Sequence, residues 1–218
     1  MKTIKVSMLF LVCLICLGCN FSSQDEVDND NLPQEDISIE ELALLNKQVK
    51  NGETTCSRTL EIYKTIVDSN YNAKDIEGPN ILRNALAGET LDVLKEQINE
   101  ELEKDPIQGI EFLEKLFSIN PNEEIIDWLN STIDSTTDTY YAEGKLDQAY
   151  EVINKRFRYG FEMDAMDLRI KIGIELVDKL KEDGNADEAE SIINELENII
   201  NIPDNIALKE KYADQLSE

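Results

Sequence analysis

Helix-start signals recur at short intervals from Ile37 to the C-terminus, and they narrow the folds open to this chain more than any other feature. At the first of them, Ser38 is followed three residues later by Glu41, which is the pattern of a capping box. Apolar residues then follow at helical spacing until Gly52, a residue type that commonly ends helices. No stretch alternates apolar and polar residues for long enough to predict a strand. We therefore expect an all-α fold.

Further helix starts are predicted at Thr55, Pro79, Thr90, Asp105 and Asn120. The helix that Pro79 opens is expected to be short and to end at Gly88, so that Thr90 caps a separate helix. Asp105 and Asn120 are each followed by proline, which suits the first turn of a helix. We expect about eight to ten helices, arranged as a helical bundle or a short stack of α-hairpins.

The C-terminal third contains an internal echo of period 40. The repeated positions are Tyr140, Gly144, Ala149 and Ile153, matched by Leu180, Gly184, Ala189 and Ile193. A glycine that permits a left-handed turn, followed by a small alanine that permits close approach, is what two tightly packed antiparallel helices require. The pattern resembles the helix–turn–helix unit of tetratricopeptide repeats, although their Trp and Pro positions are missing and their period is about 34. A helical bundle with glycine stops is the alternative.

A core stripe is expected between these two hairpins. Its members are Met163, Met166, Ile170, Ile174 and Val177. They follow one another at helical spacing, which predicts that they share one buried face of a helix.

The N-terminal segment differs in kind from the rest of the chain. Lys2 and Lys5 precede an almost unbroken apolar run of 12 residues, from Val6 to Leu17. This length is typical of a signal peptide and too short to span a bilayer, which needs about 20 residues. Gly18 and Cys19 then stand at the boundary with polar sequence, and the arrangement resembles the lipobox of bacterial lipoproteins. That resemblance implies removal of residues 1–18 and a diacylglycerol on Cys19, whereas an ordinary secretory signal is the alternative.

Residues 20–36 carry six acidic side chains and show no apolar periodicity. Such a segment cannot bury enough apolar surface to fold, and its like charges repel one another. The predicted organisation is a signal peptide at 1–18, a lipidated cysteine with a disordered acidic tether at 19–36, and an all-helical domain at 37–218.

The cysteines indicate that packing alone holds this domain together. Cys13 and Cys16 would leave with the signal peptide and Cys19 would carry lipid, so only Cys56 would remain as a thiol. A single cysteine cannot form an internal disulfide. We expect Cys56 to be a small apolar core residue, with an exposed reactive thiol as the alternative.

Charge and composition exclude several classes of function. Loss of Lys2 and Lys5 would take the formal net charge from −25 to −27, which disfavours binding to nucleic acid and to anionic lipid. The chain has no histidine, which removes histidine-based catalysis and most zinc sites. No phosphate-binding glycine loop is present. We expect a protein that is not an enzyme and that binds no cofactor or metal.

One basic segment, Lys155–Tyr159, interrupts the acidic sequence and contains two aromatic residues. It fits a helix C-terminus, where cations interact favourably with the helix dipole and Phe157 packs inward. It also fits a binding surface, because arginine and tyrosine are favoured at interface hot spots. The candidate partner contacts are therefore Arg156, Arg158 and Tyr159.

The sequence therefore suggests a membrane-anchored lipoprotein that binds a protein partner through its helical domain. Its isoleucine- and asparagine-rich composition and its lipobox resemble the surface lipoproteins of spirochaetes such as Borrelia. That resemblance implies display at the outer membrane or cell surface and binding to a host component, such as a complement regulator. A periplasm-facing scaffold or assembly lipoprotein with tetratricopeptide-like hairpins is the alternative.

Overall fold

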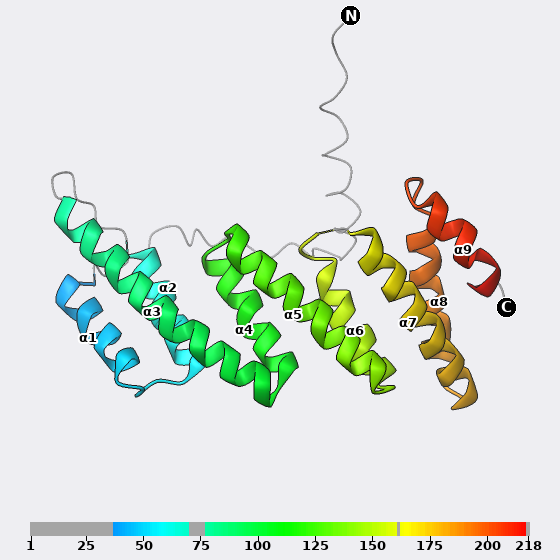
Figure 1. The fold of residues 1–218 in the computed structure, drawn as a ribbon, viewed down its shortest axis with the longest axis horizontal. Helices are drawn as coiled ribbons and strands as arrows, with labels where there is room; N and C mark the ends of the chain where they lie inside the picture. The colour runs from blue at the N-terminus through cyan, green and yellow to red at the C-terminus, as the bar shows by residue number, and fades with distance from the viewer. Residues whose placement is uncertain (1–36, 70–76, 161, 217–218) are drawn as a thin grey trace, which may run out of the picture. The chain divides into compact units, whose positions relative to one another are not determined.

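The computed structural model describes residues 37–69, 77–160 and 162–216. These residues form nine α-helices and no strand, which confirms the all-α prediction (Figure 1). All nine helices belong to one compact unit that extends from Asp36 to Glu218. The lipidation site predicted at Cys19 and the acidic tether lie outside the described residues.

Helices that are adjacent in sequence also pack against each other. They are α1 (Ile39–Lys50), α2 (Cys56–Asp68), α3 (Glu77–Lys104), α4 (Pro106–Ile119), α5 (Glu123–Ala142), α6 (Leu146–Arg156), α7 (Met163–Glu182), α8 (Ala186–Ile200) and α9 (Ile206–Leu216). Each helix contacts the next one along the chain, and additional contacts join α1 to α3, α2 to α4 and α7 to α9. The core is therefore built mainly between near neighbours in sequence, as expected for stacked α-hairpins.

Three predicted helix starts are confirmed in detail. Ser38 forms the full capping box, in which its hydroxyl accepts from the Glu41 amide and its own amide donates to the Glu41 carboxylate. The Thr55 hydroxyl accepts from the amide of Arg58 at the start of α2. Asp105 caps α4 with proline in the first turn. These side chains satisfy amides that have no partner within their helices.

The prediction of two helices around Gly88 was wrong, because α3 is continuous from Glu77 to Lys104. Thr90 does not cap a helix but is fully buried within one. Its hydroxyl oxygen lies 2.8 Å from the carbonyl oxygen of Leu86 and 2.9 Å from the Oδ1 atom of Asn46 on α1. Burial of this hydroxyl is possible because Asn46 supplies a polar partner, which the local sequence of α3 does not reveal. Ile81 and Leu82, in the first turns of α3, are exposed.

The start predicted at Asn120 is displaced by two residues. Asn120 ends α4, and its side-chain amide donates to the Tyr63 hydroxyl at 2.8 Å. The cap of α5 is Asn122, whose side chain accepts from the amide of Ile125. Both asparagines are suitable caps, and a long-range contact to α2 decides which role each one takes.

The internal echo corresponds to two hairpins, α5–α6 and α7–α8, with matching turns (Figure 1). Gly144 and Gly184 have φ angles of 73° and 81°, the left-handed conformation that glycine adopts without strain. In each turn an amide reaches back five residues, from Lys145 to Tyr140 and from Asn185 to Leu180, at 2.9 and 2.8 Å. The alanines expected at the close contacts, Ala149 and Ala189, are both buried.

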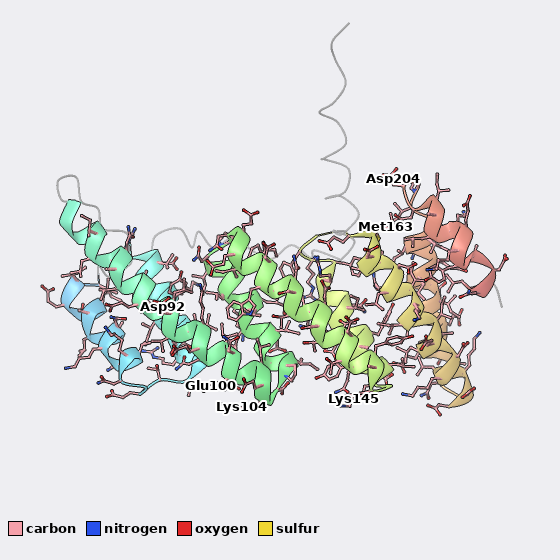
Figure 2. All side chains as sticks on the ribbon, viewed as in Figure 1. Asp92, Glu100, Lys104, Lys145, Met163 and Asp204 are labelled. Atoms are coloured by element: carbon pink, nitrogen blue, oxygen red, sulfur yellow. The ribbon has the colours of Figure 1, made fainter. Side chains whose placement is uncertain are left out.

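The core stripe on α7 is confirmed for Met166, Ile170 and Val177, which are buried, whereas Ile174 is partly buried. Met163 was expected in the same stripe but is exposed, since it stands at the first residue of the helix (Figure 2). Cys56 is a buried free thiol in the main core, as predicted. Its burial raises the pKa of the thiol to about 12, so it stays protonated at neutral pH.

Candidate functional site

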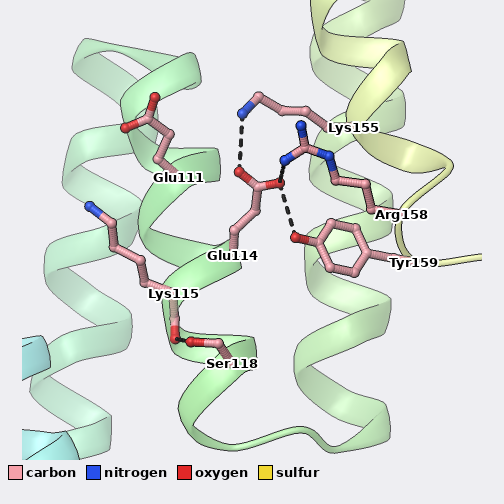
Figure 3. Close-up of a pocket in the computed structure, with 7 residues that line it drawn as sticks. All are labelled: Glu111, Glu114, Lys115, Ser118, Lys155, Arg158 and Tyr159. Carbon is pink, nitrogen blue, oxygen red and sulfur yellow. Dashed lines mark hydrogen bonds and ion pairs between the residues drawn. The ribbon is translucent and has the colours of Figure 1, made fainter. Parts of the chain in front are cut away.

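The basic segment lines an open cleft of about 330 Å³ (Figure 3). One wall comes from α4, and the other comes from the last turn of α6 and the residues that follow it. The lining residues are Glu111, Glu114, Lys115, Ser118, Lys155, Arg158 and Tyr159. At the cleft, the basic segment lies against α4, and Lys155 contacts Glu114, which is 41 residues earlier in the chain.

Glu114 holds the two walls together. Its side chain is 15% exposed, and its two oxygens are shared by three groups from the basic segment. Lys155 Nζ lies 3.0 Å from Oε2, the Tyr159 hydroxyl donates to Oε1 at 3.0 Å, and Arg158 NH1 lies 3.6 Å from Oε1 (Figure 3). A partly buried carboxylate with this many donors is well satisfied, so Glu114 positions the segment on α4.

Tyr159 is fixed by its ring as well as by its hydroxyl. The ring packs edge-on against Phe117, with centroids 5.6 Å apart and an interplanar angle of 86°. Burial raises the pKa of Tyr159 to about 12, and the hydrogen bond to Glu114 acts in the same direction. Tyr159 is therefore a neutral hydrogen-bond donor throughout the physiological pH range. Its side chain also lines the cleft.

Arg156 lies inside the protein, where the sequence had suggested a surface contact. It is 2% exposed, and its NH2 atom lies 2.8 Å from Glu162 Oε1. Its Nε atom lies 3.4 Å from Asp134 Oδ1 on α5, an ion-pair distance without hydrogen-bond geometry. Burial raises the pKa of Asp134, and the Arg156 charge opposes that effect. Arg156 thus joins α5, α6 and the start of α7, and direct contact with a partner would require these pairs to open.

Arg158 is the exposed cation of the segment. Its side chain is 68% exposed, so the 3.6 Å pair with Glu114 leaves much of the guanidinium available. Across the cleft, Lys115 lies over the Phe112 ring at 5.3 Å and forms no ion pair with a described carboxylate. The cleft lining has three cations against two carboxylates, a small positive excess on a chain of net charge −25. This composition favours binding of an acidic or hydrogen-bond-accepting group.

The polar groups of the cleft are engaged in local hydrogen bonds and ion pairs. Ser118 donates its hydroxyl to the Lys115 carbonyl at 2.6 Å, so no base in the cleft activates it. Across the described ranges, no group of three or more His, Cys, Asp or Glu side chains is placed to hold a metal ion. Within the same part of the chain, no helix combines the length and apolarity needed to cross a bilayer.

The sequence did not reveal the hydrogen bond from Tyr159 to Glu114. It also did not reveal three similar hydrogen bonds, in which a tyrosine hydroxyl donates to a carboxylate on another helix. These are Tyr141 to Glu175 at 2.5 Å, Tyr150 to Glu195 at 3.0 Å and Tyr212 to Asp167 at 2.9 Å. The chain has 46 acidic residues, so no local signal distinguishes these four carboxylates from the others. The tyrosines offered a partial signal, since a half-buried tyrosine usually directs its hydroxyl to a partner.

No protein-family model matches this chain, and neither the curated proteins nor the solved structures compared with it gave a significant match.

Proposed function

We propose that this protein is a membrane-anchored lipoprotein without enzymatic activity that binds a protein partner through its helical domain. The observation that carries the proposal is the cleft between α4 and the basic segment, which presents Arg158 and Tyr159 beside one another. An arginine and a tyrosine held on a rigid framework are the residue types that most often dominate interface energies. Arg156 takes a supporting role here, because its buried pairs hold the segment in place.

The anchor is proposed from the sequence alone. Cys19 follows a small glycine at the polar end of the apolar run, which is where lipoprotein processing attaches a diacylglycerol. The acidic residues that follow would form a flexible connection of roughly 20–25 Å, enough to hold the helical domain clear of the lipid surface. We propose display at the outer membrane or cell surface, with a host component such as a complement regulator as the partner.

A periplasm-facing scaffold is the second candidate. The matching turns of α5–α6 and α7–α8 favour it, since repeated α-hairpins commonly present an extended surface to other proteins. The two candidates differ in location and not in the kind of site. Protease treatment of intact cells distinguishes them, because a surface protein is digested whereas a periplasmic protein is protected.

The anchor is tested by replacing Cys19 with alanine. We expect the Cys19→Ala protein to lose palmitate labelling and to move to the aqueous phase on detergent partitioning. Continued labelling of this variant would disprove the assignment of Cys19.

The binding role of the cleft is tested by capture of a partner from host serum and from cell-envelope extract, followed by measurement of its affinity for variants. We expect Arg158→Ala to weaken binding about 30-fold, which corresponds to a hot-spot loss of about 2 kcal/mol. Arg58→Ala is the matched control, because Arg58 is also an exposed arginine paired with a glutamate. Equal affinities for the two variants would remove the cleft from the proposal.

A further inference from the structure

A second surface lies at the end of the domain where α7 begins and where α8 passes into α9. Three large apolar side chains are exposed there: Met163 (47% exposed), Ile202 (44%) and Ile206 (65%). The α8–α9 connection is held at the first turns of α7, because the Asn205 side-chain amide lies 3.8 Å from the Met166 sulfur. We call Met163, Ile202 and Ile206 the end patch.

The fold does not need these side chains to be apolar. In α9 the buried residues are Leu208, Tyr212 and Leu216, which recur every four positions along one face. Ile206 precedes Leu208 by two residues, or about 200° of helical rotation, and so faces the opposite side. Met163 stands at the first position of α7, one turn before the buried Met166. Exposed apolar groups gathered at one end of a monomer commonly mark an interaction surface.

Two acidic residues flank members of the end patch in the sequence. Asp164 and Asp204 are exposed and have no cationic partner among the described residues. The nearby lysines of α9 are already engaged, Lys209 with Asn201 at 2.8 Å and Lys211 with Asp167 at 2.6 Å. The patch therefore combines an apolar centre with an uncompensated negative rim.

We infer that the end patch docks an amphipathic helix with a basic face from a protein partner. Apolar side chains of that helix would cover Met163, Ile202 and Ile206, and its lysines or arginines would face Asp164 and Asp204. A second copy of this chain is a poor occupant, because two acidic rims on chains of net charge −25 would repel each other. The inference rests on the proposed protein-binding function, but it concerns a different surface from the cleft.

The test uses a synthetic peptide of about 18 residues, built from leucine and lysine so that it forms an amphipathic helix. Its binding to the full chain in a nonionic detergent is followed by fluorescence anisotropy. We expect the double variant Met163→Ser/Ile206→Ser to weaken binding at least tenfold, because both side chains lose their buried contact with the peptide. The matched control is Leu44→Ser/Ile81→Ser, two similarly exposed apolar residues elsewhere on the domain, which should change affinity less than twofold.

The rim is tested by salt dependence. Asp164→Asn/Asp204→Asn should flatten the loss of affinity with increasing salt, whereas Asp187→Asn/Glu188→Gln, at the opposite end of α8, should leave it unchanged. Equal effects of the two charge changes would mean that the peptide follows the net charge of the chain, and the inference would fail. A leucine–glutamate peptide that binds as tightly would also overturn it.

A direct readout does not depend on any variant. The methyl resonance of Met163 should shift when the leucine–lysine peptide is added to the unaltered chain. Peptide binding without a shift of this resonance would place the interaction elsewhere. None of the three experiments alters Arg158 or Cys19, so failure of this inference is distinguishable from failure of the proposed cleft or anchor.

Discussion

Gly173 stands in the interior of α7, where glycine is normally unfavourable, and its replacement by alanine tests how closely the hairpins approach. A Cβ atom added at Gly173 would lie 2.9 and 3.1 Å from the two δ-methyl carbons of Leu196 on α8 and 3.0 Å from Cε2 of Tyr150 on α6. Neither neighbour can move freely. Leu196 is fully buried, and the Tyr150 hydroxyl donates to Glu195. The missing side chain is therefore what allows three helices to meet.

Two effects of opposite sign decide the outcome of Gly173→Ala. Alanine gains about 1 kcal/mol of helix propensity over glycine. Overpacking of a close contact costs about 1–3 kcal/mol. We expect a net loss of stability of about 0–2 kcal/mol in the free energy of unfolding.

Gly88→Ala is the control: it is the same substitution inside a helix, but it should raise the free energy of unfolding. Gly88 lies in the interior of α3, and an added Cβ there would meet no atom within 4 Å. Gly88→Ala should therefore stabilise the protein by about 0.5–1 kcal/mol. Helix propensity contributes equally to both variants, so the difference between their free energies of unfolding gives the cost of the close contacts at Gly173.

The measurement is urea unfolding followed by circular dichroism, with the slope of the transition compared between variants. A Leu196→Ala background should reduce the penalty of Gly173→Ala by about 1 kcal/mol, because two of the three closest atoms are then absent. If Gly173→Ala stabilises the protein as much as Gly88→Ala does, α6, α7 and α8 do not meet as closely as described.

Three further outcomes are expected. Ala149→Leu and Ala189→Leu should each lower the free energy of unfolding by about 1–3 kcal/mol, seen as lower urea midpoints, because both sites are buried at helix contacts. A chain that begins at Ile37 should melt within a few degrees of the longer chain, and a large drop would mean that the preceding segment packs on the domain. Burial opposes ionisation of Asp167, but hydrogen bonds from Lys211 and from a tyrosine prevail and lower its pKa. Its stabilising effect should therefore be present above the ordinary aspartate pKa of about 4 and be lost as the pH falls below it, and Asp167→Asn should flatten this part of the acid-unfolding curve.

Much of the local structure could be predicted from the sequence, because it depends on interactions within a few residues. The capping box at Ser38, the cap at Asp105 and the left-handed turns at Gly144 and Gly184 are all of this kind. A hydroxyl or carboxylate three residues before a free amide, or a glycine at a helix end, acts in the same way in most surroundings. The recurrence of such signals was sufficient to predict an all-α fold.

Where the structure differs from the sequence-based prediction, the cause is a partner residue far away along the chain. Thr90 resembles a cap, yet it lies inside α3. Its hydroxyl can be buried there because it forms a hydrogen bond with Asn46, 44 residues earlier. Arg156 resembles a surface cation, yet it is buried because carboxylates from α5 and from the start of α7 converge on it. The cost of burying a polar or charged group depends on whether a partner is present, and local sequence does not contain that information.

In the candidate site too, local sequence revealed one part and long-range contacts determined the other. The basic segment was recognisable as a candidate from its composition, whereas Glu114, which holds it on α4, was one acidic residue among 46. Tyr159 and Glu114 are 45 residues apart and meet only when α4 and α6 pack on the same neighbour, α5. Short-range capping and turn energies thus determine where helices begin and end, while the pairing of buried polar groups determines which charges remain at the surface for a partner.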